Sequence, residues 1–133
     1  MIYPMAVMVL LIFLVGFYAL GARIRAVRSK ALSIKYFKLM GGEAAPDDVV
    51  KSTRCFNNLF EVPTLFFAAG VAALVTGATG SAMLLFAWLF VVSRAVQAFV
   101  HLTDNNVRAR ALSYFSSLIN VAIMWVLLVV HVA

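Results

Sequence analysis

A polar stretch runs directly into an apolar one at residues 54–67, RCFNNLFEVPTLFF, and this junction governs how the chain can cross a membrane. The apolar run Val62–Val75 has 14 residues and covers about 21 Å as a helix, whereas a bilayer core needs about 30 Å. A spanning helix must therefore begin earlier and carry Arg54, Asn58 and Glu61 towards the lipid. These residues stand at i, i+4 and i+7 and share one helix face. Ionisable groups at such depth are costly, so they indicate a functional site.

The composition is typical of a polytopic membrane protein. Of 133 residues, 65% are hydrophobic and 12% are charged, which predicts one all-α integral membrane domain over residues 1–133. Eight of the eleven Lys and Arg residues lie between Arg23 and Arg54. Such clustering indicates a cytoplasmic loop attracted to anionic lipids, and it argues against a nucleic-acid partner. The lone Cys55 excludes an internal disulfide, and the spacing of His and Cys residues predicts no metal site.

We expect a bundle of four transmembrane helices, at about residues 1–39, 48–76, 81–102 and 108–131. The first helix has 22 uncharged residues before Arg23 and should continue beyond it, because residues 26–37 contain no helix breaker. Pro63 should kink the second helix, because its ring clashes with the carbonyl of Leu59. The positive charges place both termini outside and the basic loop inside, as in a multi-pass protein of a bacterial inner membrane.

The third helix repeats the length problem of the second. Residues 81–93 provide about 20 Å, so the helix must continue through polar residues that share a face at i, i+3 and i+7, namely Arg94, Gln97 and His101. The fourth helix opens with Arg110 and Tyr114 on one face. All these groups, with Arg23, fall in one layer near the cytoplasmic face. Lipid cannot satisfy them, so they should face each other or a wet pocket.

The charge balance of this polar layer favours an anionic ligand. Several arginines oppose a single carboxylate, Glu61. Such a balance suits a ligand with at least two carboxylates, which arginine forks bind, and one ammonium, which Glu61 can take. An arginine beside a ligand thiol would also favour the thiolate.

Three motifs in order resemble the MAPEG family, the membrane-associated proteins of eicosanoid and glutathione metabolism. They are Arg54-x-x-x-Asn58-x-x-Glu61-x-Pro63, Arg94 with His101, and Arg110-x-x-x-Tyr114. The resemblance covers nearly the whole chain. It implies a four-helix protomer that assembles as a homotrimer, with glutathione bound between adjacent protomers near the cytoplasmic face.

The resemblance also implies roles for individual residues. Arg110 matches the arginine that stabilises the thiolate in the leukotriene-synthase branch. The other candidates for holding glutathione are Arg23, Arg54, Asn58, Glu61, Arg94, Gln97, His101 and Tyr114. Departures from the prostaglandin-synthase branch count against prostaglandin isomerisation, and they are found at Asn57, Gln97, His101 and Ala111.

We therefore expect a glutathione S-transferase or peroxidase of the membrane that acts on lipophilic electrophiles or hydroperoxides. The alternative is a non-catalytic lipid-binding or scaffold member of the same family. Two alternatives also stand for individual residues. Glu61 can form a structural ion pair with Arg54 or Arg94, and Arg110 can anchor its helix at the lipid headgroups.

Overall fold

The computed structural model describes residues 1–42 and 44–133, and within these ranges it contains helices and turns but no strand. The helices are α1 (Ile2–Arg28), α2 (Tyr36–Leu39), α3 (Asp47–Asn58), α4 (Val62–Thr76), α5 (Ser81–Leu102) and α6 (Val107–Val132). Among the described residues, four segments are long and apolar enough to cross a membrane: Ile2–Arg28, Asp47–Thr76, Ser81–Leu102 and Val107–Val132. The predicted all-α, multi-pass membrane architecture with four candidate membrane helices is thus confirmed.

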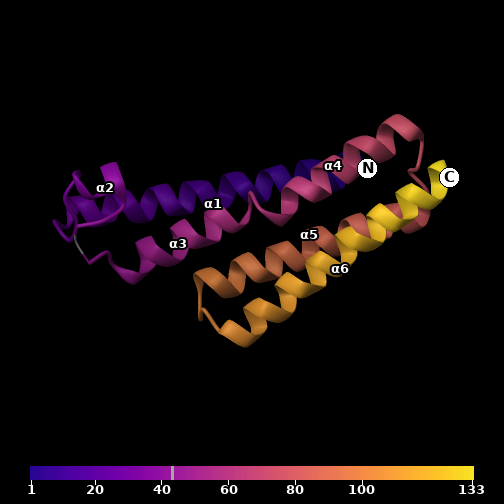
Figure 1. Cartoon of the computed structure of the whole chain (residues 1–133). Helices are drawn as coiled ribbons and strands as arrows, with labels where there is room; N and C mark the ends of the chain where they lie inside the picture. The colour runs from indigo at the N-terminus through magenta and orange to yellow at the C-terminus, as the bar shows by residue number, and fades with distance from the viewer. Residues whose placement is uncertain (43) are drawn as a thin grey trace.

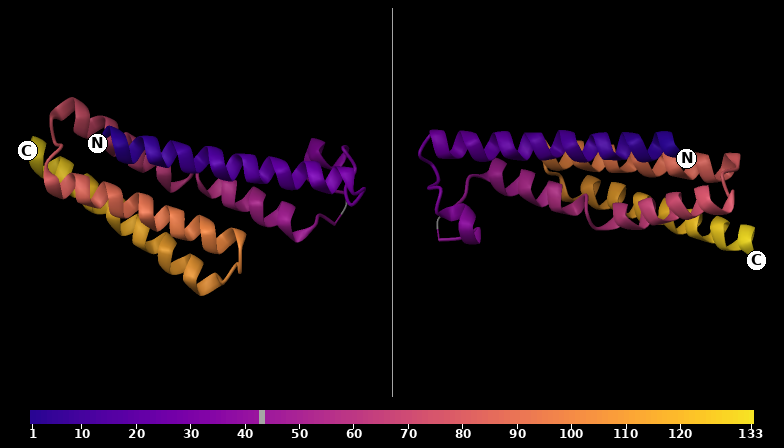
Figure 2. Two further views of the ribbon diagram at one scale, coloured as in Figure 1. Left: turned by 180° about the vertical axis from the view of Figure 1, so that it is seen from behind. Right: turned by 90° about the horizontal axis from the view of Figure 1, so that it is seen from above.

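The helices form two hairpins that diverge towards one end. Figure 1 shows α1 beside α3 and α4, and α5 beside α6, with both termini at the end where the hairpins lie close together. At the opposite end the α5–α6 hairpin leans away from α1 and α3, and the view from behind in Figure 2 agrees. The most extensive packing joins α5 to α6, followed by α1 to α3.

The core fills the half of the bundle where the hairpins meet. Phe66 on α4 stacks on Phe90 of α5, with ring centroids 4.4 Å apart and planes 4° from parallel. Both rings are fully buried, as are Met8 of α1 and Met124 of α6. Large buried side chains of four helices therefore belong to one core cluster, which stabilises the bundle through close packing. Large apolar side chains such as Phe17 remain exposed on the outside, as the lipid-facing surface of a membrane protein requires.

The prediction that the first helix extends to about residue 39 is wrong, because α1 ends at Arg28. The amides of Ala31 and Leu32 both donate to the carbonyl of Ala26, at 3.0 and 3.2 Å. Leu32 and Tyr36 are 2% and 8% exposed in a small cluster against α1 and α3. Burial of these two side chains ends α1 and turns the chain back, although this segment contains no glycine or proline. α2 is a separate helix of a single turn.

The segment expected as one helix over residues 48–76 consists of two helices. α3 ends at Asn58, the chain makes a turn through Leu59 and Phe60, and α4 begins at Val62 with Pro63 in its first turn. The kink expected at Pro63 is therefore present as a break. Proline stabilises the start of α4, where its missing N–H costs nothing, while its ring prevents α3 from continuing.

A close contact between α1 and α3 yields a test of this packing. A Cβ added at Gly16 would lie 3.0 Å from Cε2 of the Phe56 ring, whereas one at Gly21 would meet only Nη1 of the Arg25 side chain, at 3.4 Å. We predict that Gly16→Val destabilises the detergent-solubilised protein by about 1–3 kcal/mol through overpacking. Gly21→Val is the matched control on the same helix. Equal melting temperatures for the two variants would contradict this account of the α1–α3 contact.

Candidate functional site

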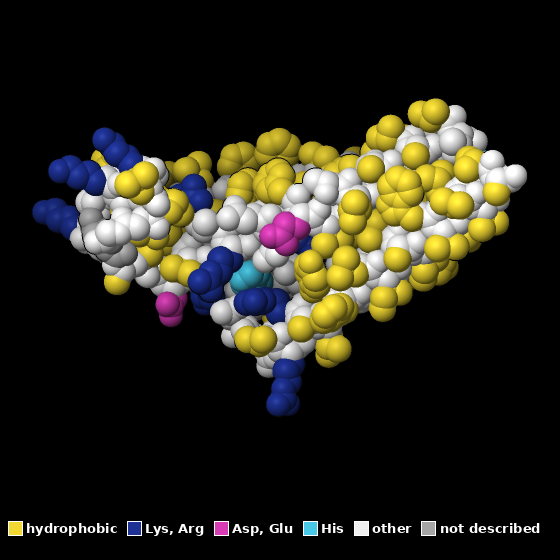
Figure 3. All heavy atoms as spheres, viewed as in Figure 1, with side chains coloured by type: hydrophobic (Ala, Val, Ile, Leu, Met, Phe, Trp, Pro, Cys, Tyr) yellow, Lys and Arg dark blue, Asp and Glu magenta, His cyan; other side chains and the backbone are white. Residues whose placement is uncertain are grey.

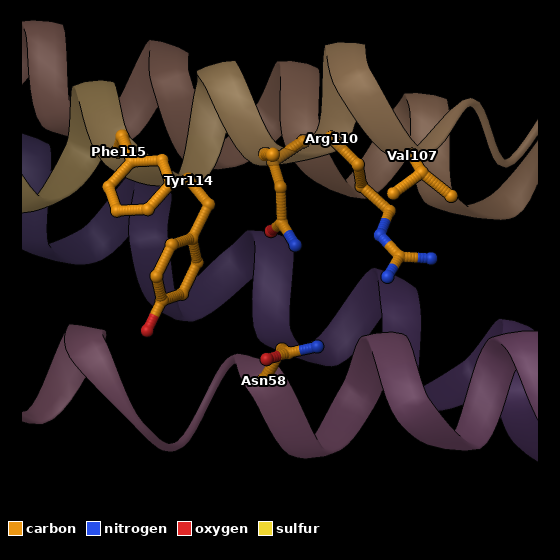
Figure 4. A pocket seen from close by; sticks show the side chains of 7 residues that line it. Asn58, Val107, Arg110, Tyr114 and Phe115 are labelled. Carbon is orange, nitrogen blue, oxygen red and sulfur yellow. The ribbon is translucent and has the colours of Figure 1, made fainter.

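A small pocket lies between the two hairpins, on the side where they diverge. It has a volume of ≈ 170 Å³ and its lining comes from α3, α5 and α6: Asn58, Gln97, Val107, Arg110, Ala111, Tyr114 and Phe115. Figure 4 shows Asn58 on α3 facing Arg110 and Tyr114, which project from α6 across the gap. Four predicted site residues from the two hairpins thus line one cavity: Asn58, Gln97, Arg110 and Tyr114.

Arg94 is buried beside this pocket and is tied to the helix break. Its side chain is 0% exposed, its Nη2 donates to the carbonyl oxygen of Asn58, and its guanidinium carbon lies 5.8 Å from the ring centroid of Tyr114. In an unbroken helix the Asn58 carbonyl would accept from the amide of Val62. The break frees this carbonyl, and Arg94 satisfies it with a charged donor.

A second, more polar pocket of ≈ 360 Å³ lies next to the first. Most of its lining is charged or polar and comes from α3, α5, the α5–α6 turn and α6: Asp47, Val50, Lys51, Arg54, His101, Asp104, Asn105 and Arg110. Arg110 lines both pockets. In Figure 3, Lys and Arg side chains gather with a histidine in the hollow at the middle of this face, whereas the end that carries the termini shows none.

The start of α6 holds Arg110 in place. The Asn106 side chain accepts from the amides of Arg108 and Ala109 at 3.0 and 3.1 Å, which caps the helix. Asn105 adopts a left-handed backbone with φ 52°, and its Oδ1 accepts from Nη1 of Arg110. Sequence reasoning missed Asn105. The only sequence signal for it is the turn composition of Thr-Asp-Asn-Asn at residues 103–106.

Several buried polar atoms of the site have no hydrogen-bond partner within the described ranges. They are Nε and Nη1 of Arg94, Oε1 of Gln97, and both ring nitrogens of His101. Gln97 and His101 are 2% and 1% exposed. Unpaired polar groups at such burial are expensive. They fit a ligand that brings carboxylates and amide groups of its own.

Three predicted site residues lie outside the lining of both pockets: Arg94, which is buried beside the smaller one, and Arg23 and Glu61. Arg23 donates from Nη2 to Oγ1 of Thr53 at 3.2 Å and faces a different groove. Glu61 is exposed at the break, just before α4. Among the residues that the structure describes, the only ion pair joins Arg25 to Asp48, at 3.7 Å. The alternative of a structural ion pair from Glu61 to Arg54 or Arg94 is therefore not found.

In the folded chain the site has the excess of positive charge that the sequence predicts. In the polar pocket, Lys51, Arg54 and Arg110 oppose Asp47 and Asp104, and the buried Arg94 adds a further cation nearby. Guanidinium groups at reduced dielectric attract carboxylates strongly and hold them bidentately. This arrangement can bind a small polyanionic ligand.

Comparison with known proteins agrees with this picture. The sequence model of the MAPEG family matches residues 1–130 of the chain. Comparisons with curated proteins and with solved structures found no match.

The bond from Arg94 to the Asn58 carbonyl yields a test of how the site is built. We predict that Arg94→Met lowers the stability of the ligand-free protein by about 1–3 kcal/mol, because a carbonyl at membrane depth loses its donor. Thermal unfolding in detergent measures the effect. Arg108→Met is the control, since Arg108 is exposed on α6. An unchanged melting temperature for Arg94→Met would show that the break does not depend on this bond.

Proposed function

The chain belongs to the MAPEG family, and from this premise we propose that it is a glutathione-dependent membrane transferase or peroxidase acting on lipophilic electrophiles or hydroperoxides. Many members of the family are glutathione-dependent enzymes, and the family generally binds glutathione. One observation carries the proposal for this chain. Arg94 is fully buried, has two nitrogens without partners among the described residues, and lies beside the pocket that Arg110 lines.

The polar groups of the two pockets suit the functional groups of glutathione. We assign its two carboxylates to arginines, with Arg54 in the polar pocket and Arg94 beside the smaller one, because the guanidinium fork matches a carboxylate. The side-chain amides of Asn58 and Gln97 can pair with peptide groups of the tripeptide. His101 offers two unpaired ring nitrogens at the floor of the polar pocket. Bound glutathione would supply a thiol as nucleophile or reductant.

Arg110 is the residue that we propose as catalytic. A cation next to a thiol lowers the thiol pKa and so increases the thiolate fraction at neutral pH. The hydrogen bond to Asn105 fixes the guanidinium at the junction of the two pockets. Val107 and Phe115 line the same pocket and are 68% and 60% exposed. A lipophilic substrate can therefore approach Arg110 from the lipid-facing side of α6.

We further propose that the active protein is a homotrimer, since the family is typically trimeric. Glu61 supports this proposal. Its carboxylate is exposed near the helix break and pairs with no cation of the described chain, which is costly for an ionisable group facing lipid. An adjacent protomer, or the ammonium of glutathione held between protomers, would relieve that cost.

Calorimetric titration with glutathione and with S-hexylglutathione, together with turnover of an aryl halide and of a lipid hydroperoxide, tests the function. We predict that Arg110→Gln still binds glutathione but loses about 10²–10³-fold in kcat, the cost of removing one electrostatic stabiliser. Its rate should then rise with pH as the free thiol ionises near pH 8.5–9, whereas the natural protein should vary little above neutral pH.

Arg108→Gln is the matched control, because it removes the same charge two residues earlier on α6 from an exposed position. Equal kcat values and pH profiles for the natural protein and Arg110→Gln would refute the role of Arg110. If glutathione produced neither heat nor a melting shift, the result would support the non-catalytic lipid-binding alternative.

A further inference from the structure

The turn between α5 and α6, residues 103–106, has a backbone fixed by hydrogen bonds to the end of α5. The amide of Thr103 donates to the carbonyl of Phe99 at 3.0 Å, and the amide of Asn105 donates to the carbonyl of Val100 at 2.8 Å. Asn105 has φ 52°, in the left-handed region, which asparagine tolerates better than most residues. The direction of the Asn105 side chain is therefore set by the way in which α5 ends.

Asn105 and Arg110 occupy two positions of a helix start that commonly hold an apolar pair. Asn106 is the N-cap of α6, so Asn105 is at N′ and Arg110 is at N4. Apolar side chains at these two positions often pack together and fix the angle at which the chain enters the helix. Here Nη1 of Arg110 donates to Oδ1 of Asn105 instead. This polar pair fixes a guanidinium as well as the start of the helix.

The nitrogen of the Asn105 amide is available to a ligand. A guanidinium has only donors, so the amide atom that faces Arg110 must be the oxygen. The Asn105 Nδ2 donates to no acceptor within residues 1–42 and 44–133. Asn105 is half-buried and lines the polar pocket together with Lys51 and Arg54. A carboxylate that these two cations attract can therefore accept a hydrogen bond from Nδ2.

The Asn105 amide links the polar pocket to the smaller one. Its oxygen and nitrogen belong to one planar group, so a ligand bonded to Nδ2 also fixes the orientation of Oδ1. Hydrogen bonds in series polarise one another. Arg110 lines both pockets, and its long side chain has considerable rotamer freedom to lose. Holding Arg110 before the reaction removes this entropic cost from the chemical step.

We propose that Asn105 is a positioning residue that couples occupancy of the polar pocket to the orientation of Arg110. Its Oδ1 holds the guanidinium, and its Nδ2 donates to the glutathione carboxylate that Arg54 binds in the same pocket. The catalytic cation is then held most firmly when glutathione, and not a smaller thiol, is bound. The inference rests on the proposed function, to which it adds a means by which the site selects glutathione.

The variant Asn105→Gly tests this role in the full-length protein, because glycine adopts φ 52° without strain. We predict that kcat for glutathione with an aryl halide falls about tenfold, with a smaller rise in KM. The rate should also increase with pH, as predicted for Arg110→Gln, because the thiol relies more on its own ionisation. A residue that only contacted the ligand would change KM alone. A residue that only supported the fold would lower the melting temperature without changing the pH profile.

A double-mutant cycle and a modified substrate separate action through Arg110 from other effects. Asn105→Gly should lower kcat little further once Arg110→Gln is present, because the group to be positioned is gone. With the dimethyl ester of glutathione, which lacks both carboxylates, the loss caused by Asn105→Gly should be clearly smaller than with glutathione. Asn105→Asp keeps an acceptor for Arg110 but cannot donate to the ligand, so it should raise KM for glutathione and leave KM for the ester unchanged.

Asn106→Ser is the matched control in the same turn. Serine keeps the cap of α6, and Asn106 lies outside the lining of both pockets. Its kcat and pH profile should equal those of the natural protein, and thermal unfolding checks that each variant is folded.

Four results would overturn the proposal while the proposed function stands. The first is an unchanged kcat and pH profile for Asn105→Gly. The second is the same loss of kcat in the Arg110→Gln background, which would show that Asn105 does not act through Arg110. The third is an equal loss with glutathione and its dimethyl ester, and the fourth is an unchanged KM of Asn105→Asp for glutathione. Either would show that Asn105 does not sense the ligand. If the natural protein neither bound glutathione nor turned over either substrate, the proposed function and the role of Asn105 would both be refuted.

Discussion

The structure depends on the bond between Arg94 and the Asn58 carbonyl. Pro63 prevents α3 from continuing. In the turn that follows, the amides of Leu59 and Phe60 donate to the carbonyls of Phe56 and Asn57, but the Asn58 carbonyl loses the amide donor it would have in a continuous helix. In water such a carbonyl would be solvated, but at membrane depth only protein can satisfy it. The α5 guanidinium does so. The pairing joins the two hairpins at the level where they begin to diverge, and it brings a fixed charge to the wall of the smaller pocket.

The hairpins diverge because large apolar side chains fill only one half of the bundle between them. The half of the bundle near the termini is filled by Phe66, Phe90 and Met124, which belong to one buried cluster with Met8 of α1. In the other half the facing positions carry long polar side chains such as Arg94, Gln97 and Arg110, which cannot pack as a dry layer. The helices separate there (Figure 1), and the gap becomes the pair of polar pockets.

Much of this could be predicted from the sequence, because segment length and helical spacing are local properties. The short apolar runs predicted that polar residues share one depth, and seven of the nine candidates lie in or beside the two pockets. The end of α1 could not be predicted, since it depends on Leu32 and Tyr36 finding Val49, which lies far along the chain. The hydrogen bond that Arg110 donates to the Asn105 side chain could not be predicted either, because it depends on the left-handed backbone of Asn105. Arg23 belongs to the polar layer predicted from the sequence, but in the structure it lines a different groove, formed by α1 and α2.

The distribution of arginine and lysine agrees with this division of the molecule. The buried or pocket-lining cations are mostly arginines, including Arg23, Arg94 and Arg110, whereas Lys30, Lys35 and Lys38 are exposed in the loop. An ammonium is strongly hydrated and loses its proton readily when buried, while a guanidinium keeps its charge and offers several directed donors. A lysine at position 94 would therefore supply neither a dependable charge nor the geometry to bond one carbonyl and still face a ligand. Sites that select anions at membrane depth are best built from arginine, and the lysines remain where only attraction to a charged surface is needed.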